Sequence, residues 1–279
     1  MNAFDEKNPL VSVVMASYNE PAKIIGQAID SILNQTYRNL ELIIVDDSSS
    51  SETVEKIKSY TDDRLLIISL EGHSWLPEKL NIGIRHANGN FIARMDADDI
   101  ALSDRLEKQI VFLTEHPEIV VLGGQVNLMD EDGRIFSEKL YPLGGTKLLL
   151  HATFKSPFNH PSVVMRKELV DRGFFYNEEL IKTSEDIELW LRIIHEGYKI
   201  ANIPDKVTNY RVRKEMAKWR SSKEEIQFMA KVRKDTFSWK MPIHSVISFI
   251  AGRIFLLIPR EMITNMYSDM YQKGMNNKK

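Results

Sequence analysis

The chain has 279 residues, of which 43% are hydrophobic and 27% are charged, a balance typical of a globular protein. It contains no cysteine, which excludes disulfides, thiolate metal sites and cysteine nucleophiles. The absence of cysteine is compatible with a reducing, cytoplasmic setting. No apolar run reaches the length of a membrane-spanning helix, and the polar residues 1–9 do not read as a signal peptide.

The net charge of −2 hides an asymmetry along the chain. Residues 1–205 carry 21 Lys and Arg against 33 Asp and Glu, whereas residues 206–279 carry 16 against 6. An acidic body with a basic tail predicts that the tail meets an anionic partner, which is either a membrane surface or a nucleic acid.

Two kinds of apolar segment alternate along the first half of the chain. Short runs rich in β-branched residues predict strands, and apolar residues at helical spacing predict helices. The expected strands are residues 10–16, 40–45, 65–70, 91–95 and 119–122, and the expected helices are residues 24–33, 52–60, 78–86 and 104–116, with helix caps at Asn19 and Ser103. The alternation predicts an α/β fold with a mostly parallel, Rossmann-like sheet and helices on both faces.

Polar residues follow three of these strands at the point where each strand ends. In sheets of this kind, ligands bind outside the carboxyl ends of the strands, so we expect one binding site to form there. The polar residues are Ser17, Tyr18 and Asn19 after the first strand, Asp46 and Asp47 after the second, and Asp96, Asp98 and Asp99 after the fourth.

The segment from Arg94 to Asp99 gathers three carboxylates directly after a strand. Like charges repel at such short spacing, and a divalent cation such as Mg²⁺ or Mn²⁺ offsets the repulsion by binding carboxylate oxygens. A solvated acidic turn is the alternative interpretation of the same pattern. The sequence has no glycine-rich phosphate loop, so a metal is the natural partner for a diphosphate at this site.

Four stretches of the sequence together resemble the family 2 glycosyltransferases: Val13 to Asn19, Ser31 to Tyr37, Glu41 to Ser49 and Gly89 to Asp99. The likeness runs from about residue 11 to about residue 210. It implies a GT-A fold and an inverting enzyme that uses a nucleotide-sugar, of the kind that builds bacterial cell-surface polysaccharides such as capsule. The Gln-x-x-Arg-Trp motif of the processive members is not found, which argues for transfer of a single sugar.

The resemblance implies a nucleotide-sugar half of about residues 1–125. Ala16, Tyr18 and Asn19 would line the nucleotide pocket, with the Tyr18 ring against the base. Asp47 would accept a hydrogen bond from a uracil ring, which favours UDP, and Asp46 would brace the loop or the ribose. A core-edge aromatic and an Asx turn are the structural alternatives for Tyr18 and for the two aspartates.

The resemblance also implies a metal site in the Asp-x-Asp motif. Asp98 would ligate Mn²⁺ or Mg²⁺ under the donor diphosphate, and Asp96, next to Ala97, would face the ribose or the metal shell. Asp99 would support the sugar or the loop. Arg213 stands where many relatives carry a histidine, so it could contact the diphosphate in place of a third metal ligand.

The acceptor half, about residues 126–220, supplies His160, Glu185 and Asp186. The match to the family implies that Asp186 is the catalytic base for the acceptor hydroxyl and that Glu185 orients it or contacts the acceptor. Acidic residues in the first turn of a helix, capped by Ser184, are a sufficient structural explanation for the same pair. His160 could touch a sugar or could be an ordinary turn histidine.

The sequence predicts a basic amphipathic helical tail over residues 221–279, in which residues 243–258 are the most apolar stretch. A short apolar helix with basic flanks predicts peripheral attachment to the inner face of the cell membrane, which suits a lipid-linked saccharide acceptor. Packing on the body, or on a second copy as a homo-oligomer, is the alternative.

Two other functions fit parts of the sequence. A nucleotidyltransferase could use a metal and a nucleotide on the same sheet, but it gives no role to Glu185 and Asp186. A non-enzymatic nucleic-acid binder could use the basic tail, but the tail has no recognition motif and the acidic body would repel phosphates, so we expect no nucleic-acid partner.

Overall fold

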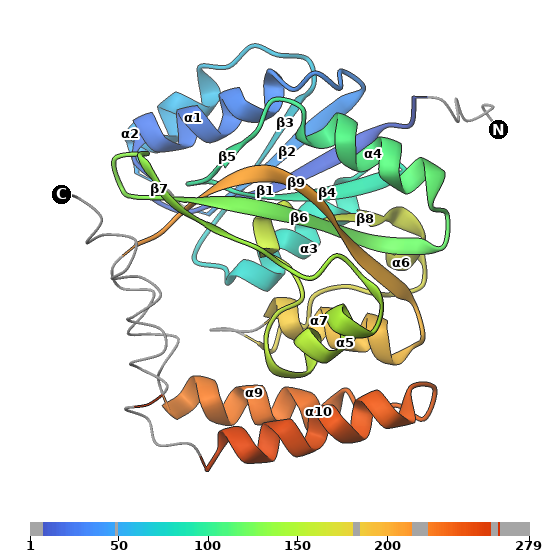
Figure 1. Cartoon of the computed structure of the whole chain (residues 1–279). Coiled ribbons are helices and arrows are strands. Elements are labelled where there is room, and N and C mark those ends of the chain that lie inside the picture. Colours follow the sequence, from blue (N-terminus) through green and yellow to red (C-terminus); the bar gives the residue numbers. More distant parts are fainter. Residues whose placement is uncertain (1–7, 48–49, 181–184, 214–222, 258–261, 263–279) are drawn as a thin grey trace.

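The structure is a computed structural model that describes residues 8–47, 50–180, 185–213, 223–257 and 262. In these ranges the strands form one nine-stranded sheet with the order β3-β2-β1-β4-β8-β6-β9-β5, and β7 pairs with β6 outside this path. Figure 1 shows α1, α2 and α4 on one face of the sheet and α3, α5 and α7 on the other, with α9 and α10 beyond them.

The first half of the chain builds four parallel strands with helical crossovers. β-Branched residues fill these strands, and side chains from alternate positions enter different cores. Val13 packs in the core that contains α1 and α4, whereas Val14 packs in the core that contains α3 and α7. The elements are β1 (Val11–Ser17), α1 (Ala22–Leu33), β2 (Leu40–Asp47), α2 (Ser51–Lys58), β3 (Leu65–Leu70), α3 (Leu76–His86) and β4 (Phe91–Asp96).

The second half adds strands of both directions. β8 runs antiparallel to both β4 and β6, and β6 and β9 are parallel along their length. The elements are β5 (Ile100–Ala101), α4 (Arg105–Glu115), β6 (Ile119–Met129), β7 (Ile135–Lys139), α5 (Gly145–Phe154), the 3-10 helix η1 (His160–Ser162), β8 (Val164–Arg166), α6 (Lys167–Asp171), α7 (Glu185–His195), β9 (Lys199–Arg211), α9 (Lys223–Asp235) and α10 (Pro242–Phe255).

The predicted α/β fold is confirmed, and two local predictions are wrong. Asn19 does not cap α1, because Pro21 is the N-cap residue and no side chain caps this end. Ser103 does not cap α4, whose N-cap residue is Asp104, again without a side-chain hydrogen bond. The predicted cap at Ser184 lies outside the described residues.

α9 and α10 form an antiparallel hairpin against α5 and α7 (Figure 1). Gly252 lets the two helices approach closely, because a Cβ there would come within 3.2 Å of the Ala230 Cα and the Arg233 Cδ. Among the described residues, no helix combines the length and the apolar character that crossing a bilayer requires.

Candidate active site

The carboxyl ends of β1, β2 and β4 lie side by side and bring the predicted donor residues together. Ser17 pairs with Asp46 in the β1–β2 register, and Ala16 pairs with Asp96 in the β1–β4 register. The clusters after the three strands therefore meet at one edge of the sheet, as the sequence predicts.

Asp47 is fully buried at the end of β2. Its Oδ2 atom accepts a hydrogen bond from the Ser74 amide at 2.8 Å and lies 3.6 Å from the Lys79 ammonium and 3.2 Å from the His73 Nδ1. Its Oδ1 atom is buried and has no hydrogen-bond partner among the described residues. A buried carboxylate oxygen without a donor is costly, so this atom is suited to accept a hydrogen bond from a ligand.

Lys79 was missed by sequence reasoning, because it lies inside α3 and is distant in sequence from Asp47 and Ser17, which it contacts. Its ammonium also donates to the Ser17 carbonyl at 3.3 Å and lies 5.4 Å from the centre of the Tyr18 ring. Burial lowers the pKa of Lys79, whereas the nearby Asp47 carboxylate raises it. The cation thus ties the ends of β1 and β2 together.

Tyr18 and Asn19 form the turn after β1. The Tyr18 side chain is 48% exposed, which leaves one face of its ring open to a ligand. Asn19 has a left-handed backbone with φ of 53°, which asparagine tolerates better than most residues. The Asn19 Oδ1 atom accepts a hydrogen bond from the Ser50 amide at 2.7 Å, so this residue links the turn after β1 to the start of α2.

Asp96, Asp98 and Asp99 form one cluster, in which one carboxylate oxygen from each residue lies within 4.8 Å of the others. Burial and then the Asp96 charge raise the pKa of Asp98 to about 6, and burial and then Asp98 raise the pKa of Asp99 well above its usual range. The Asp99 Oδ2 atom is buried without a partner among the described residues. A set of three carboxylates offers only oxygen ligands, which fits a hard divalent cation.

Arginines surround the cluster. Arg94, from the middle of β4, pairs with Asp96, and the Arg213 guanidinium lies 2.8 Å from the Asp98 carboxylate and 2.5 Å from Glu20. The Arg211 amide donates to Asp99 at 2.7 Å. Arg213 therefore lies beside Asp98, close to where the sequence places the donor diphosphate.

Glu185 and Asp186 begin α7, and the Asp186 Oδ2 accepts a hydrogen bond from the Ser156 hydroxyl at 3.0 Å. Burial and then Asp186 raise the pKa of Glu185 to about 8, so Glu185 is protonated at neutral pH while it lies next to Asp186. A protonated Glu185 carries no charge that would repel the neighbouring Asp186 carboxylate.

His160 lies on the acceptor side and contacts Glu185. Its Nδ1 is 3.7 Å from the Glu185 Oε1, and its Nε2 is 2.7 Å from the Tyr176 hydroxyl. Burial and then the Arg94 charge lower the pKa of His160 well below its usual value, so the ring is neutral at pH 7. The contact between His160 and Glu185 is therefore one between neutral groups.

Arg94 joins the two sides of the site. It is 6% exposed, pairs with Asp96 on the predicted donor side, and its charge acts on Glu185 and Tyr176 on the predicted acceptor side. The sequence offered a signal for this residue, because a charge in the middle of an apolar strand is costly unless it is paired.

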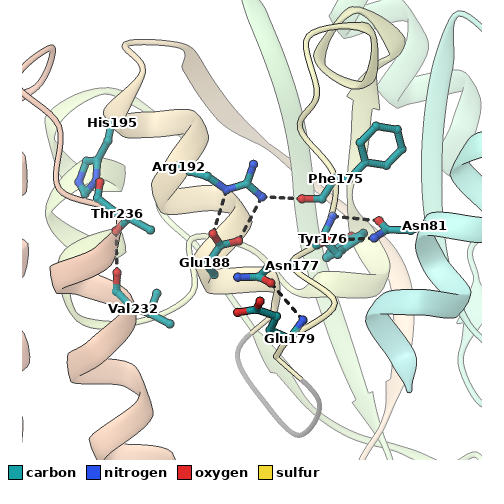
Figure 2. A network of polar contacts seen from close by, with 10 residues as sticks. All are labelled: Asn81, Phe175, Tyr176, Asn177, Glu179, Glu188, Arg192, His195, Val232 and Thr236. Atoms are coloured by element: carbon teal, nitrogen blue, oxygen red, sulfur yellow. Dashed lines mark hydrogen bonds and ion pairs between the residues drawn. The ribbon is translucent and has the colours of Figure 1, made fainter. Parts of the chain in front are cut away.

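Figure 2 shows how the segment before α7 is held. The Asn81 side chain donates to the Tyr176 carbonyl at 2.8 Å and accepts from the Tyr176 amide at 2.9 Å. Arg192 pairs with Glu188 one turn earlier on α7 and donates to the Phe175 carbonyl. These bonds fix Tyr176, and with it the hydroxyl that contacts His160.

Comparisons with known proteins identify the family of this chain. The sequence model of glycosyl transferase family 2 matches residues 12–174. The amylovoran biosynthesis glycosyltransferase AmsE of Erwinia amylovora is 32% identical over 274 residues, which cover 95% of this chain and 98% of that protein. The UDP-Glc:alpha-D-GlcNAc-diphosphoundecaprenol beta-1,3-glucosyltransferase WfgD of Escherichia coli is 29% identical over 200 residues, which cover 67% of this chain and 71% of WfgD.

Two solved structures share the fold. S. aureus TarS 1-349 in complex with UDP-GlcNAc superposes with a TM-score of 0.68 at 21% identity, over 88% of this chain and 72% of that chain. The mannosyltransferase PcManGT from Pyrobaculum calidifontis in complex with GDP-Man and Mn2+ has a TM-score of 0.64 at 19% identity, over 96% of this chain and 82% of that chain. The fold is therefore GT-A, and the chain belongs to glycosyl transferase family 2 and is a glycosyltransferase.

Proposed function

We propose that this glycosyltransferase moves one sugar from a nucleotide-sugar, with UDP favoured, to a hydroxyl of a saccharide acceptor in bacterial surface-polysaccharide synthesis. The observation that carries the proposal is the position of the buried Asp47 beside an aspartate cluster at one edge of the sheet. Asp47 supplies an oxygen that can accept a hydrogen bond from the nucleotide base. The aspartate cluster supplies oxygen ligands for a cation beside the diphosphate.

The donor half, about residues 1–125, would hold the nucleotide. Ala16 and Tyr18 would line the base pocket, and the Asp47 Oδ1, which lacks a partner among the described residues, would accept the hydrogen bond of a uracil N–H. Asp46 and Asn19 would brace the loops around the ribose. The TarS complex, which holds UDP-GlcNAc on the same fold, supports this assignment.

Asp98 and Asp96, supported by Asp99, would hold Mn²⁺ or Mg²⁺. The cation would offset the negative charge of the departing nucleoside diphosphate. Arg213 would share this task, because its guanidinium already lies at the Asp98 carboxylate. PcManGT, solved with Mn2+, supports a divalent metal in this fold.

The acceptor half, about residues 126–220, would bind and deprotonate the acceptor. Asp186 would take the proton of the attacking hydroxyl, with its carboxylate oriented by the Ser156 hydrogen bond. Glu185 and His160 would contact the acceptor or the transferred sugar. Attack from the face opposite the leaving group inverts the anomeric centre, so no covalent intermediate on the enzyme is needed.

The acceptor would be lipid-linked, and the enzyme would be peripheral on the cytoplasmic face of the cell membrane, attached through the tail after residue 220. Two observations support this: the name of WfgD, which specifies a diphosphoundecaprenol-linked acceptor, and the basic charge of residues 206–279.

Calorimetry with UDP tests the donor site, on the wild type and on Asp98→Ala, with and without Mn²⁺. We expect UDP to bind more tightly with the metal, and Asp98→Ala to remove the metal dependence. Asp132→Ala, which removes an exposed carboxylate from the β6–β7 turn, is the matched control and should behave as the wild type. If UDP, TDP and GDP all fail to bind with any metal, the proposal is wrong.

A further inference from the structure

α10 is built with its polar residues inside and its isoleucines outside. His244, Ser245 and Ser248 are at most 8% exposed and face the hairpin partner and the body. Ile243, Ile250 and Ile254 are 77%, 50% and 51% exposed. A helix that packs on a globular domain normally has the opposite arrangement, because burial of apolar surface is what holds it there.

Specific polar contacts maintain this arrangement. The His244 ring lies 2.9 Å from the His195 ring and 2.9 Å from the Leu149 carbonyl. The Ser245 hydroxyl donates to the Ser238 carbonyl at 3.0 Å, which closes the turn before α10. These bonds orient the helix, so its outward isoleucines are a fixed feature of the fold.

We call the outward set the outer face of α10. Its members recur every three or four residues, so they lie along one side of the helix as a continuous apolar strip. Trp239 before the helix and Leu257 after it are 81% and 82% exposed. The outer face consists of Ile243, Val246, Ile247, Ile250 and Ile254.

Basic residues predominate in the segment that carries this strip, and one of them, Lys240, is paired with Glu196 directly after α7. From Thr236 to Arg260 the sequence contains no aspartate or glutamate, whereas it contains Lys240, Arg253 and Arg260. An exposed tryptophan next to a lysine, as at positions 239 and 240, is typical of side chains at the headgroup level of a bilayer. An exposed apolar strip on a helix whose sequence carries basic and no acidic residues complements an anionic lipid surface.

We propose that the outer face of α10 lies in the interface of an anionic lipid bilayer and holds the enzyme there. This inference rests on the proposed function, because membrane binding would bring the enzyme to a lipid-linked acceptor. α10 has 14 residues and is therefore about 21 Å long, too short to cross the hydrocarbon core, so it lies along the surface.

A second copy of the chain fits the strip less well. A two-fold contact would place the outer face against itself and would bring the two Arg253 side chains into one interface, whereas residues 236–260 contain no acidic residue to pair with them. Lipid phosphates neutralise these charges.

The placement of α10 also orients the catalytic half. α7 begins with Glu185 and Asp186 and packs on the hairpin through Ile187 and Leu191, which contact Val232 of α9 (Figure 1). A membrane under α10 therefore lies on the side of the molecule that carries α7 and not on the side of α1 and α2.

Vesicle flotation of the full chain tests the proposal. Vesicles of phosphatidylglycerol and phosphatidylcholine in equal parts should carry the wild type upward, and vesicles of phosphatidylcholine alone should carry less. Ile250→Glu should weaken binding to the mixed vesicles at least about tenfold, because it places a charge in the centre of the strip. Val111→Glu, at a site on α4 with a similar exposure of 52%, should bind as the wild type.

Three results would overturn the inference: no flotation of the wild type with the mixed vesicles, unchanged binding of Ile250→Glu, or a dimer in ultracentrifugation that Ile250→Glu converts to a monomer. The unfolding midpoint of Ile250→Glu must match that of the wild type. UDP calorimetry on the same samples separates the two proposals. If only the membrane proposal is wrong, UDP still binds, and if only the donor-site proposal is wrong, the protein still floats with the vesicles.

Discussion

His195 at the end of α7 and His244 in α10 face each other, with 2.9 Å between the His195 Nε2 and the His244 Nδ1. The His195 Nδ1 contacts the Thr236 carbonyl, and the His244 Nε2 contacts the Leu149 carbonyl. Each carbonyl needs an N–H from a ring, and the contact between the two rings needs a third N–H. Two neutral histidines have only two N–H groups between them. A third proton would complete the set, but burial opposes the charge and lowers the pKa of His195 to about 4.

This pair predicts that acid loosens the hairpin. In the unfolded chain these rings are protonated below about pH 6.5, whereas His195 in the folded chain is protonated only near its pKa of about 4. The free energy of unfolding is therefore highest above about pH 6.5 and decreases as the pH falls. The loss at pH 5 should be on the order of 2 kcal/mol. Thermal unfolding between pH 7 and 4.5 measures it, and His195→Gln should show a shallower dependence.

Glu185 predicts a pH dependence of the opposite sign. Its folded pKa of about 8 lies above that of an unfolded glutamate, so the folded chain holds a proton that is lost as the pH rises, and stability declines from about pH 4.5 to 8. Glu185→Gln keeps the neutral form at every pH. Its unfolding midpoint should equal that of the wild type at pH 4.5 and exceed it by at least about 3 °C at pH 8. Equal midpoints at both pH values would contradict the raised pKa.

Asp186→Asn should lower kcat by about 100-fold or more, because the acceptor hydroxyl loses its base. The affinity for UDP should not change, since Asp186 belongs to the acceptor side. Ser156→Ala, which removes the hydrogen bond to the Asp186 Oδ2, should cost about tenfold in kcat. Asp171→Asn removes an exposed carboxylate from α6 and is the control. Sugar transfer or donor hydrolysis from a UDP-sugar supplies the rates.

Asp47→Asn tests base recognition. If the Asp47 Oδ1 accepts the uracil N3–H, the wild type should bind UDP at least about tenfold more tightly than N3-methyl-UDP, which has no hydrogen to donate. Asp47→Asn should weaken UDP binding and reduce this discrimination. Calorimetry with both nucleotides on both proteins gives the comparison, and equal discrimination by the two proteins would place the base elsewhere.

The meeting of the polar residues after β1, β2 and β4 could be predicted from sequence, because each group directly follows a strand. Asp96 to Asp99 follow a strand directly, and a parallel sheet brings strand ends together without any knowledge of side-chain packing. Lys79 could not be found in this way, since its contact with Asp47 depends on how α3 lies against the sheet.

The second half of the sheet was harder to predict for a physical reason. β8 has only Val164 to Arg166, too short for a periodic pattern, and apolar residues do not encode whether a strand runs parallel or antiparallel to its neighbours. The apolar character of α10 was visible in the sequence. Its inverted orientation was not, because only the contacts of His244 show which face is inside.

Arg211, at the end of β9, joins segments that are distant along the chain. Its amide bonds to Asp99, and its guanidinium donates to the Asp98 carbonyl at 2.8 Å and to the Glu131 carbonyl at 2.7 Å. The region that matches the family ends at residue 174, before this residue and before α7. A boundary drawn at the end of this match would therefore separate the aspartate cluster from Arg211, so a fragment that keeps these contacts must include residue 211.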